Sequence, residues 1–274
     1  MNVLTPLLMG LVAFGAAPAE GDGPDAQALW RARYQRAAEE YKLFRDPELS
    51  ERLELRADPV YRWNHAAQDG GLSGSIYVWT HRGCAEAVAC FWQMKYADGT
   101  STLGHELHAL SPKVLSVSRQ GPERWKPAAA LARIALDEAP APASKPAGRL
   151  AQIRSIGSEF SGYGVNAAGE RREFRLLTTP VYRYQSSDPD VLDGALFAMV
   201  CTVGADPEVF LLVEARRTAE GPRWQFALAR FSHLNLFVSR GGREVWRAVR
   251  GPNDTFAQNA DQTYRSFHVA PRDE

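Results

Sequence analysis

Histidine and glutamate side chains can exchange protons or bind metal ions, and the sequence brings three of them together as His105, Glu106 and His108. The spacing differs from the HExxH zinc motif, in which two histidines four residues apart share one face of a helix. The surrounding residues predict a strand, on which His105 and His108 point to opposite faces while Glu106 and His108 share one. Glu106 and His108 are therefore the candidate catalytic residues for metal-assisted hydrolysis. Because a metal site needs three or four ligands, we expect neither a bound metal nor catalysis from this pair.

Three carboxylates, those of Asp188, Asp190 and Asp193, fall within one predicted turn. Hard cations such as Ca²⁺ take several oxygen ligands, so this turn is the candidate metal site. Its spacing is not that of an EF-hand loop, and aspartate before a strand commonly stabilises a turn. We therefore favour turn chemistry for these residues and predict no cofactor.

Aromatic residues supply the ligand-binding candidates, which are Trp63, Trp79, Trp92 and Tyr184. Large aromatic side chains most often lie in the core, and the core is the first expectation here as well. A curved sheet under a helix can also leave an apolar cavity or groove, which is the usual form of a small-molecule site. A protein partner that pairs along an exposed sheet edge is the alternative.

The chain has three cysteines, Cys84, Cys90 and Cys201, so at least one must be free or pair outside the molecule. Cys84 and Cys90 lie in one predicted strand, roughly 20 Å apart, whereas a disulfide allows a Cα separation of about 7 Å. These two should not bond to each other. The sequence leaves open whether Cys201 pairs with either of them.

The first nineteen residues are typical of an export signal, because they carry no charged side chain and end in the A-x-A cleavage pattern at 17–19. Their apolar run, from Val3 to Ala16, is shorter than the roughly 20 residues that a membrane-spanning helix needs. We therefore predict a signal peptide over 1–19. The mature protein is expected to be exported (periplasmic or extracellular) and not to span the membrane.

A short sequence recurs in the two halves of the chain. The segment 59–63 (PVYRW) returns as 180–184 (PVYRY), which is 180 − 59 = 121 residues later, and 74–79 (GSIYVW) matches 194–199 (GALFAM) at nearly the same offset. Matches in the same order at a near-constant offset indicate an internal repeat. The sequence therefore predicts a tandem duplication.

Each predicted unit opens with a helix and continues as short apolar runs punctuated by Gly, Pro and Asp. Strands that follow one another without helices between them form antiparallel sheets. The predicted class is therefore α+β: in each unit, a helix followed by a curved antiparallel sheet of four to five strands. This layout is similar to cystatin-like or nuclear-transport-factor-like folds. The predicted boundaries are 20–136 for the first unit, 137–146 for an Ala/Pro-rich linker, 147–250 for the second unit and 251–274 for a C-terminal tail.

Several sheet segments and turns, at 74–80, 104–110, 190–197 and 206–216, carry a resemblance to known sequences. Together they resemble a family of uncharacterised exported proteins from planctomycete-type bacteria. The resemblance covers nearly the whole mature chain. It implies a shared fold and export, and it brings no activity with it.

The charge of the chain limits its partners. It has 32 Lys and Arg against 32 Asp and Glu and a net charge of zero, which removes the electrostatic basis for binding nucleic acid. No catalytic constellation is complete, so the sequence favours an exported, non-catalytic binding or interaction module for a small apolar ligand or a protein. A metal-assisted hydrolase centred on Glu106 and His108 is the alternative.

Overall fold

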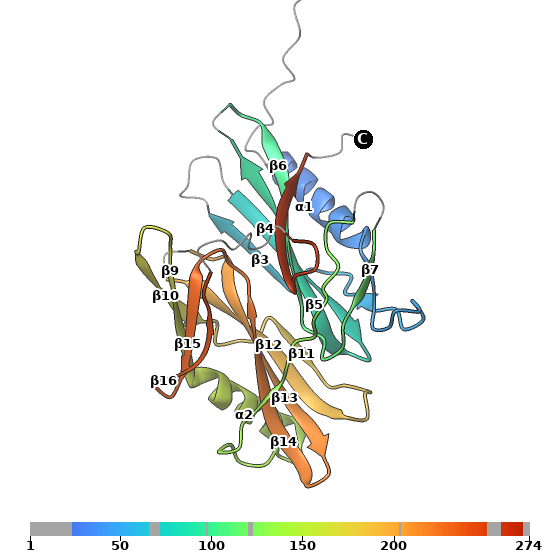
Figure 1. The fold of residues 1–274 in the computed structure, drawn as a ribbon, viewed down its shortest axis with the longest axis vertical. Coiled ribbons are helices and arrows are strands. Elements are labelled where there is room, and N and C mark those ends of the chain that lie inside the picture. Colours follow the sequence, from blue (N-terminus) through green and yellow to red (C-terminus); the bar gives the residue numbers. More distant parts are fainter. Residues whose placement is uncertain are drawn as a thin grey trace, which may run out of the picture.

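The computed structural model describes residues 24–65, 72–96, 98–119, 123–202, 204–250 and 259–270 (Figure 1). The predicted signal peptide lies outside these ranges. Within them the chain forms two helices, α1 (Pro24–Glu39) and α2 (Pro146–Ser158), and strands arranged in three sheets. All strand pairings in this part of the chain are antiparallel.

The first large sheet has six strands: β2 (Glu54–Leu55), β3 (Tyr61–His65), β4 (Leu72–His81), β5 (Cys84–Lys95), β6 (Ser101–Ala109) and β17 (Tyr264–Val269). The second has nine: β8 (Ile134–Ala135), β9 (Phe160–Val165), β10 (Arg171–Leu176), β11 (Tyr182–Tyr184), β12 (Val191–Cys201), β13 (Pro207–Thr218), β14 (Gly221–Arg230), β15 (Asn235–Arg240) and β16 (Arg243–Ala248). A small third sheet pairs β1 (Lys42–Phe44) with β7 (Ser116–Ser118).

The predicted α+β class is wrong. Half of the residues that the structure describes are in strands and only 12% are helical, with a curled multi-stranded sheet and a half-barrel. Sheets of nine and six strands replace the expected two sheets of four to five, so the cystatin-like or nuclear-transport-factor-like layout and the tandem helix-plus-sheet unit do not describe the molecule. The physical reason lies in the burial of the sheets: most of the core is made by sheet faces, and the two helices cover only part of it.

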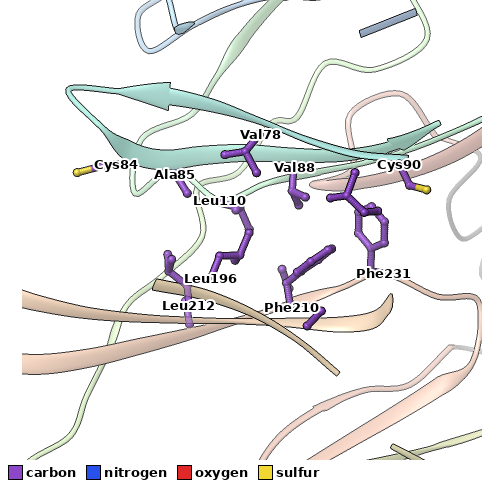
Figure 2. Packing of buried hydrophobic residues seen from close by; sticks show 14 of the residues in the cluster. Val78, Cys84, Ala85, Val88, Cys90, Leu110, Leu196, Phe210, Leu212 and Phe231 are labelled. Atoms are coloured by element: carbon purple, nitrogen blue, oxygen red, sulfur yellow. The ribbon is translucent and has the colours of Figure 1, made fainter. Parts of the chain in front are cut away.

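The layers run in the order α1, first sheet, second sheet, α2. Along β4, Ile76 and Val78 face the second sheet, whereas Tyr77 and Trp79 face α1. This alternation follows from the two-residue period of a strand, which here buries apolar side chains on both faces. The inter-sheet core joins residues of β4 and β5 to residues of β12 and β13, and Figure 2 shows their side chains meeting between the two layers.

The chain crosses between the two large sheets, so that each sheet contains a strand from outside its main run of sequence. Strand β17 follows all the strands of the second sheet in sequence, yet it pairs with β6 at the edge of the first sheet. Strand β8 precedes α2, and it pairs with β14 at the edge of the second sheet. Residues 264–269, which belong to the predicted C-terminal tail, are thus an integral strand of the first sheet.

Candidate functional site

A cavity of about 390 Å³ lies between the two large sheets. Its walls come from β3, β5, β6 and β17 on one side and from β10, the end of β12, the start of β13 and the segment after β14 on the other. Three of its lining residues, Trp63, Cys90 and Phe231, also belong to the inter-sheet core, and Cys90 and Phe231 lie close together at one end of the group drawn in Figure 2. The cavity therefore continues the inter-sheet core at one of its ends.

Two tryptophans of the first sheet form aromatic walls of the cavity, and glycines on the neighbouring strands make room for them. Trp63 of β3 lies over Gly74 of β4, where an added Cβ would meet the indole at 2.5 Å. Trp92 of β5 lies in the same way over Gly104 of β6. Only glycine leaves this space, so the positions of the two indoles are fixed by backbone as well as by packing.

Glu106 supplies a carboxyl group to the cavity from β6. It accepts a hydrogen bond from the hydroxyl of Tyr264 on β17, the strand that pairs with β6. Burial, together with the charges on Glu208 and Asp206, raises the pKa of Glu106 to about 8, while the Tyr264 hydrogen bond acts in the opposite direction. At neutral pH this carboxyl is therefore mostly protonated.

Glu208 supplies a second carboxyl from β13, on the opposite side of the cavity. Only 7% of the residue is exposed. Burial raises the pKa of Glu208 to about 7. A hydrogen bond from Ser232 and the charge of Arg172 act to lower this pKa, whereas the charge of Asp206 acts to raise it. Asp206 and Arg172 line the same cavity, so three carboxyl groups share it with one guanidinium.

His233 is a further titratable group in the cavity wall. Burial, with the charges of Arg250 and Arg230, lowers the pKa of this imidazole below its usual 6.5, so it is neutral at pH 7. Cys90 and Cys201 are also lining residues of the cavity. All three cysteines are free and buried, so Cys201 pairs with neither Cys84 nor Cys90.

The two histidines of β6 lie away from this cavity. They point to opposite faces of the strand, as its alternation predicts: His105 bonds through Nδ1 to the hydroxyl of Tyr41 at 2.9 Å on the α1 side. His108 is buried on the side of Tyr264, with Nδ1 2.7 Å from the carbonyl oxygen of Ala109. Burial lowers the pKa of His108 to about 4.

Glu106 therefore lines the cavity without His108, the other candidate catalytic residue. Among the residues that the structure describes, no group of three His, Cys, Asp or Glu side chains is placed to hold a metal ion.

The three aspartates of the candidate metal site have different surroundings. Asp193 is fully buried, and its carboxylate accepts hydrogen bonds from Arg149 at 3.0 Å and Arg183 at 2.9 Å. Asp188 accepts a hydrogen bond from the backbone N–H of Asp190, as expected for a turn. The structure thus uses Asp193 in a buried ion pair and Asp188 in turn geometry, and the three carboxylates do not converge.

The remaining aromatic candidates are also placed in the core. Trp79 faces α1 and donates a hydrogen bond to the carbonyl oxygen of Tyr41. Tyr184 lies in the inter-sheet core and donates a hydrogen bond of 2.6 Å to Glu214. Of the four ligand-binding candidates, Trp63 and Trp92 line the cavity and the other two do not.

Sequence reasoning did not single out Glu208, Asp206 or His233. Glu208 lies 208 − 106 = 102 residues from Glu106, and only the packing of the two sheets brings both into one cavity. One signal was present: Glu208 begins an otherwise apolar run (EVFLLV), and a charged residue inside a buried strand is rarely placed there without a role.

No family model, curated protein or solved structure matches this chain. Neither helix in the described ranges has the length and apolar character needed to cross a membrane.

Proposed function

We propose that this chain is a non-catalytic binding module, exported as its leader predicts, that takes a small and mostly apolar molecule between its two sheets. The observation that carries the proposal is the cavity of about 390 Å³, with indole walls and a few polar groups. Small-molecule sites are typically clefts of about 300–1,000 Å³ with apolar and aromatic linings and a small number of placed polar groups. The cavity has this size and this composition.

Binding is favoured over catalysis by the surroundings of the candidate catalytic residues. A catalytic base works beside a second group that activates or orients it near the reacting atom. His108 is bonded to the backbone outside the cavity, and Glu106 is bonded to a phenol that also belongs to the packed core. The cavity therefore offers hydrogen-bonding groups for a ligand without the histidine that the hydrolase alternative requires.

The test is a thermal unfolding experiment with small aromatic probes. We expect at least one of 2-phenylethylamine, 2-phenylethanol and 3-phenylpropionate, at millimolar concentration, to raise the melting temperature, because a ligand that binds only the folded state stabilises it. If none of the three changes the melting temperature of the wild-type protein, the cavity is not a binding site for such molecules.

A matched pair of variants ties the effect to the cavity. Ser266 lines it from β17, so Ser266→Trp should fill part of the space and remove the stabilisation by the probe. Ser161 is exposed on β9, away from the cavity, so Ser161→Trp should retain the stabilisation. Equal responses of the two variants would contradict the proposed location.

A further inference from the structure

We propose that the ligand of this cavity is a small organic cation: an apolar or aromatic body that carries a protonated amine, with the ammonium group bound at Glu106. This inference rests on the proposed function, since it names the chemical class that the inter-sheet cavity selects. It is drawn from the charges in the cavity, from its aromatic walls and from the protonation of the Glu106 carboxyl.

The charged groups of the cavity favour a positive ligand. Three carboxyl groups line it, those of Glu106, Asp206 and Glu208, against the single guanidinium of Arg172. Arg172 is exposed, so its charge is screened by solvent, whereas Glu208 is only 7% exposed. His233 adds no positive charge at neutral pH, because its pKa is lowered. A carboxylate ligand would be repelled by the charge of Asp206 and would favour the protonated form of Glu106, whereas a cation favours its carboxylate form.

The aromatic walls add a second attraction for a cation. The rings of Trp63, Trp92 and Phe231 line the same space as the carboxyl groups. The face of an aromatic ring, and of indole above all, attracts an ammonium group, and the attraction grows where water is excluded. The same rings offer apolar surface to the body of the ligand. Aromatic faces next to carboxyl groups are suited to a molecule with one cationic end and one apolar end.

Glu106 gives the binding step a measurable signature. Without a ligand, Glu106 holds its proton at pH 7, because burial raises its pKa to about 8. The titratable groups that interact with it are Tyr264, Glu208, Asp206 and Cys90. An ammonium group beside it stabilises the carboxylate and lowers this pKa. The protonated carboxyl and the ammonium ligand then form a carboxylate–ammonium pair, and one proton passes to the buffer. A neutral ligand leaves Glu106 protonated and releases none.

The experiment is isothermal titration calorimetry of the full protein at pH 7 with three probes that share one phenyl body. These are 2-phenylethylamine, 2-phenylethanol and 3-phenylpropionate, each measured in two buffers with different ionisation enthalpies. We expect the amine to bind about tenfold or more tightly than the alcohol, as a charge-assisted hydrogen bond in a buried site would give. The buffer comparison should show close to one proton released for the amine and none for the alcohol.

A pair of variants assigns the effect to Glu106. Glu106→Gln keeps the size and a hydrogen-bonding amide, so it should retain the affinity for the alcohol within about twofold while losing both the preference for the amine and the proton release. Glu123→Gln removes a carboxylate whose side chain is 55% exposed and outside the cavity, and it should behave as the wild type.

The outcomes separate this inference from the proposed function. If the alcohol or the propionate binds while the amine binds no more tightly, the cavity is a binding site but not one for cations, and the inference is overturned alone. Retention of the amine preference and of proton release in Glu106→Gln would overturn the role of Glu106. If none of the three probes binds, both the inference and the proposed function fail.

Discussion

Replacing Arg133 with methionine should destabilise the protein strongly, because Arg133 links the two large sheets through buried contacts. Its Nε donates to the Glu214 carboxylate on β13 at 2.6 Å, and its side chain is 8% exposed against 1% for Glu214. The same guanidinium donates to the carbonyl oxygen of Leu110 at 2.9 Å, just beyond the end of β6. Arg133 is thus bonded to the second sheet and to the chain that continues from the first.

The size of the effect follows from what methionine leaves behind. Glu214 would remain buried with the Tyr184 hydroxyl at 2.6 Å and the more exposed Arg216 at 3.3 Å as its partners. Removing one partner of a buried ion pair typically costs about 3–5 kcal/mol. For a chain of this size each kcal/mol corresponds to about 2–4 °C, so the melting temperature should fall by roughly 6–20 °C.

The assay is urea unfolding followed by tryptophan fluorescence, with a surface pair as the control. Lys126 and Glu123 have side chains that are 68% and 55% exposed, so Lys126→Met should change the free energy of unfolding by less than about 0.5 kcal/mol. A loss below about 1 kcal/mol for Arg133→Met, or a loss equal to that of the control, would refute the reasoning.

The pH dependence of the stability difference between the wild type and Arg133→Met gives an independent check. Burial acts to raise the pKa of Glu214, but the charge of Arg133 and hydrogen bonds from Tyr184 and Arg133 outweigh it and hold the pKa below 4.5. A depressed folded-state pKa contributes stability that is present above the unfolded value and is lost as the pH falls through the folded one. The difference between wild type and Arg133→Met should therefore be large at pH 7 and shrink towards pH 3. A difference that stays constant over this range would contradict the assignment to Glu214.

Three further predictions concern the cavity and the core. The pKa values of Glu106 and Glu208 are raised in the folded state, to about 8 and 7, so the stability that these two groups contribute should be greatest below pH 4.5 and fall as the pH rises to 8. Between pH 5 and pH 9, the free energy of urea unfolding should therefore fall less for Glu106→Gln than for the wild type. An equal fall would count against the raised pKa. Gly194→Val should lower the free energy of unfolding by about 1–3 kcal/mol, because any Cβ there meets the ring of Tyr184. If the variant unfolds at the same urea concentration as the wild type, the ring can move aside and the prediction is wrong. The three cysteines are free and buried, so a thiol reagent should react slowly with native protein and with three groups in denaturant, and fewer than three groups without reductant would reveal a disulfide.

The sequence was sufficient to predict the local geometry of the site but not its assembly. Strand alternation correctly separates His105 from His108, and the aromatic pattern includes both Trp63 and Trp92, which line the cavity. The α+β prediction failed because a strand such as β13, buried over nine consecutive residues, has both faces covered, and periodicity alone does not say whether a helix or a second sheet covers each. Glu208 was missed for the same reason, since it meets Glu106 only through packing between sheets.

The most direct test of the binding cavity is a crystal structure of the protein soaked with 4-iodobenzylamine, with the iodine located by its anomalous scattering. We predict an iodine peak between the two large sheets, beside the indoles of Trp63 and Trp92, with the ammonium group directed to the Glu106 carboxyl. Ordered probe on the outer surface with none between the sheets would contradict the account.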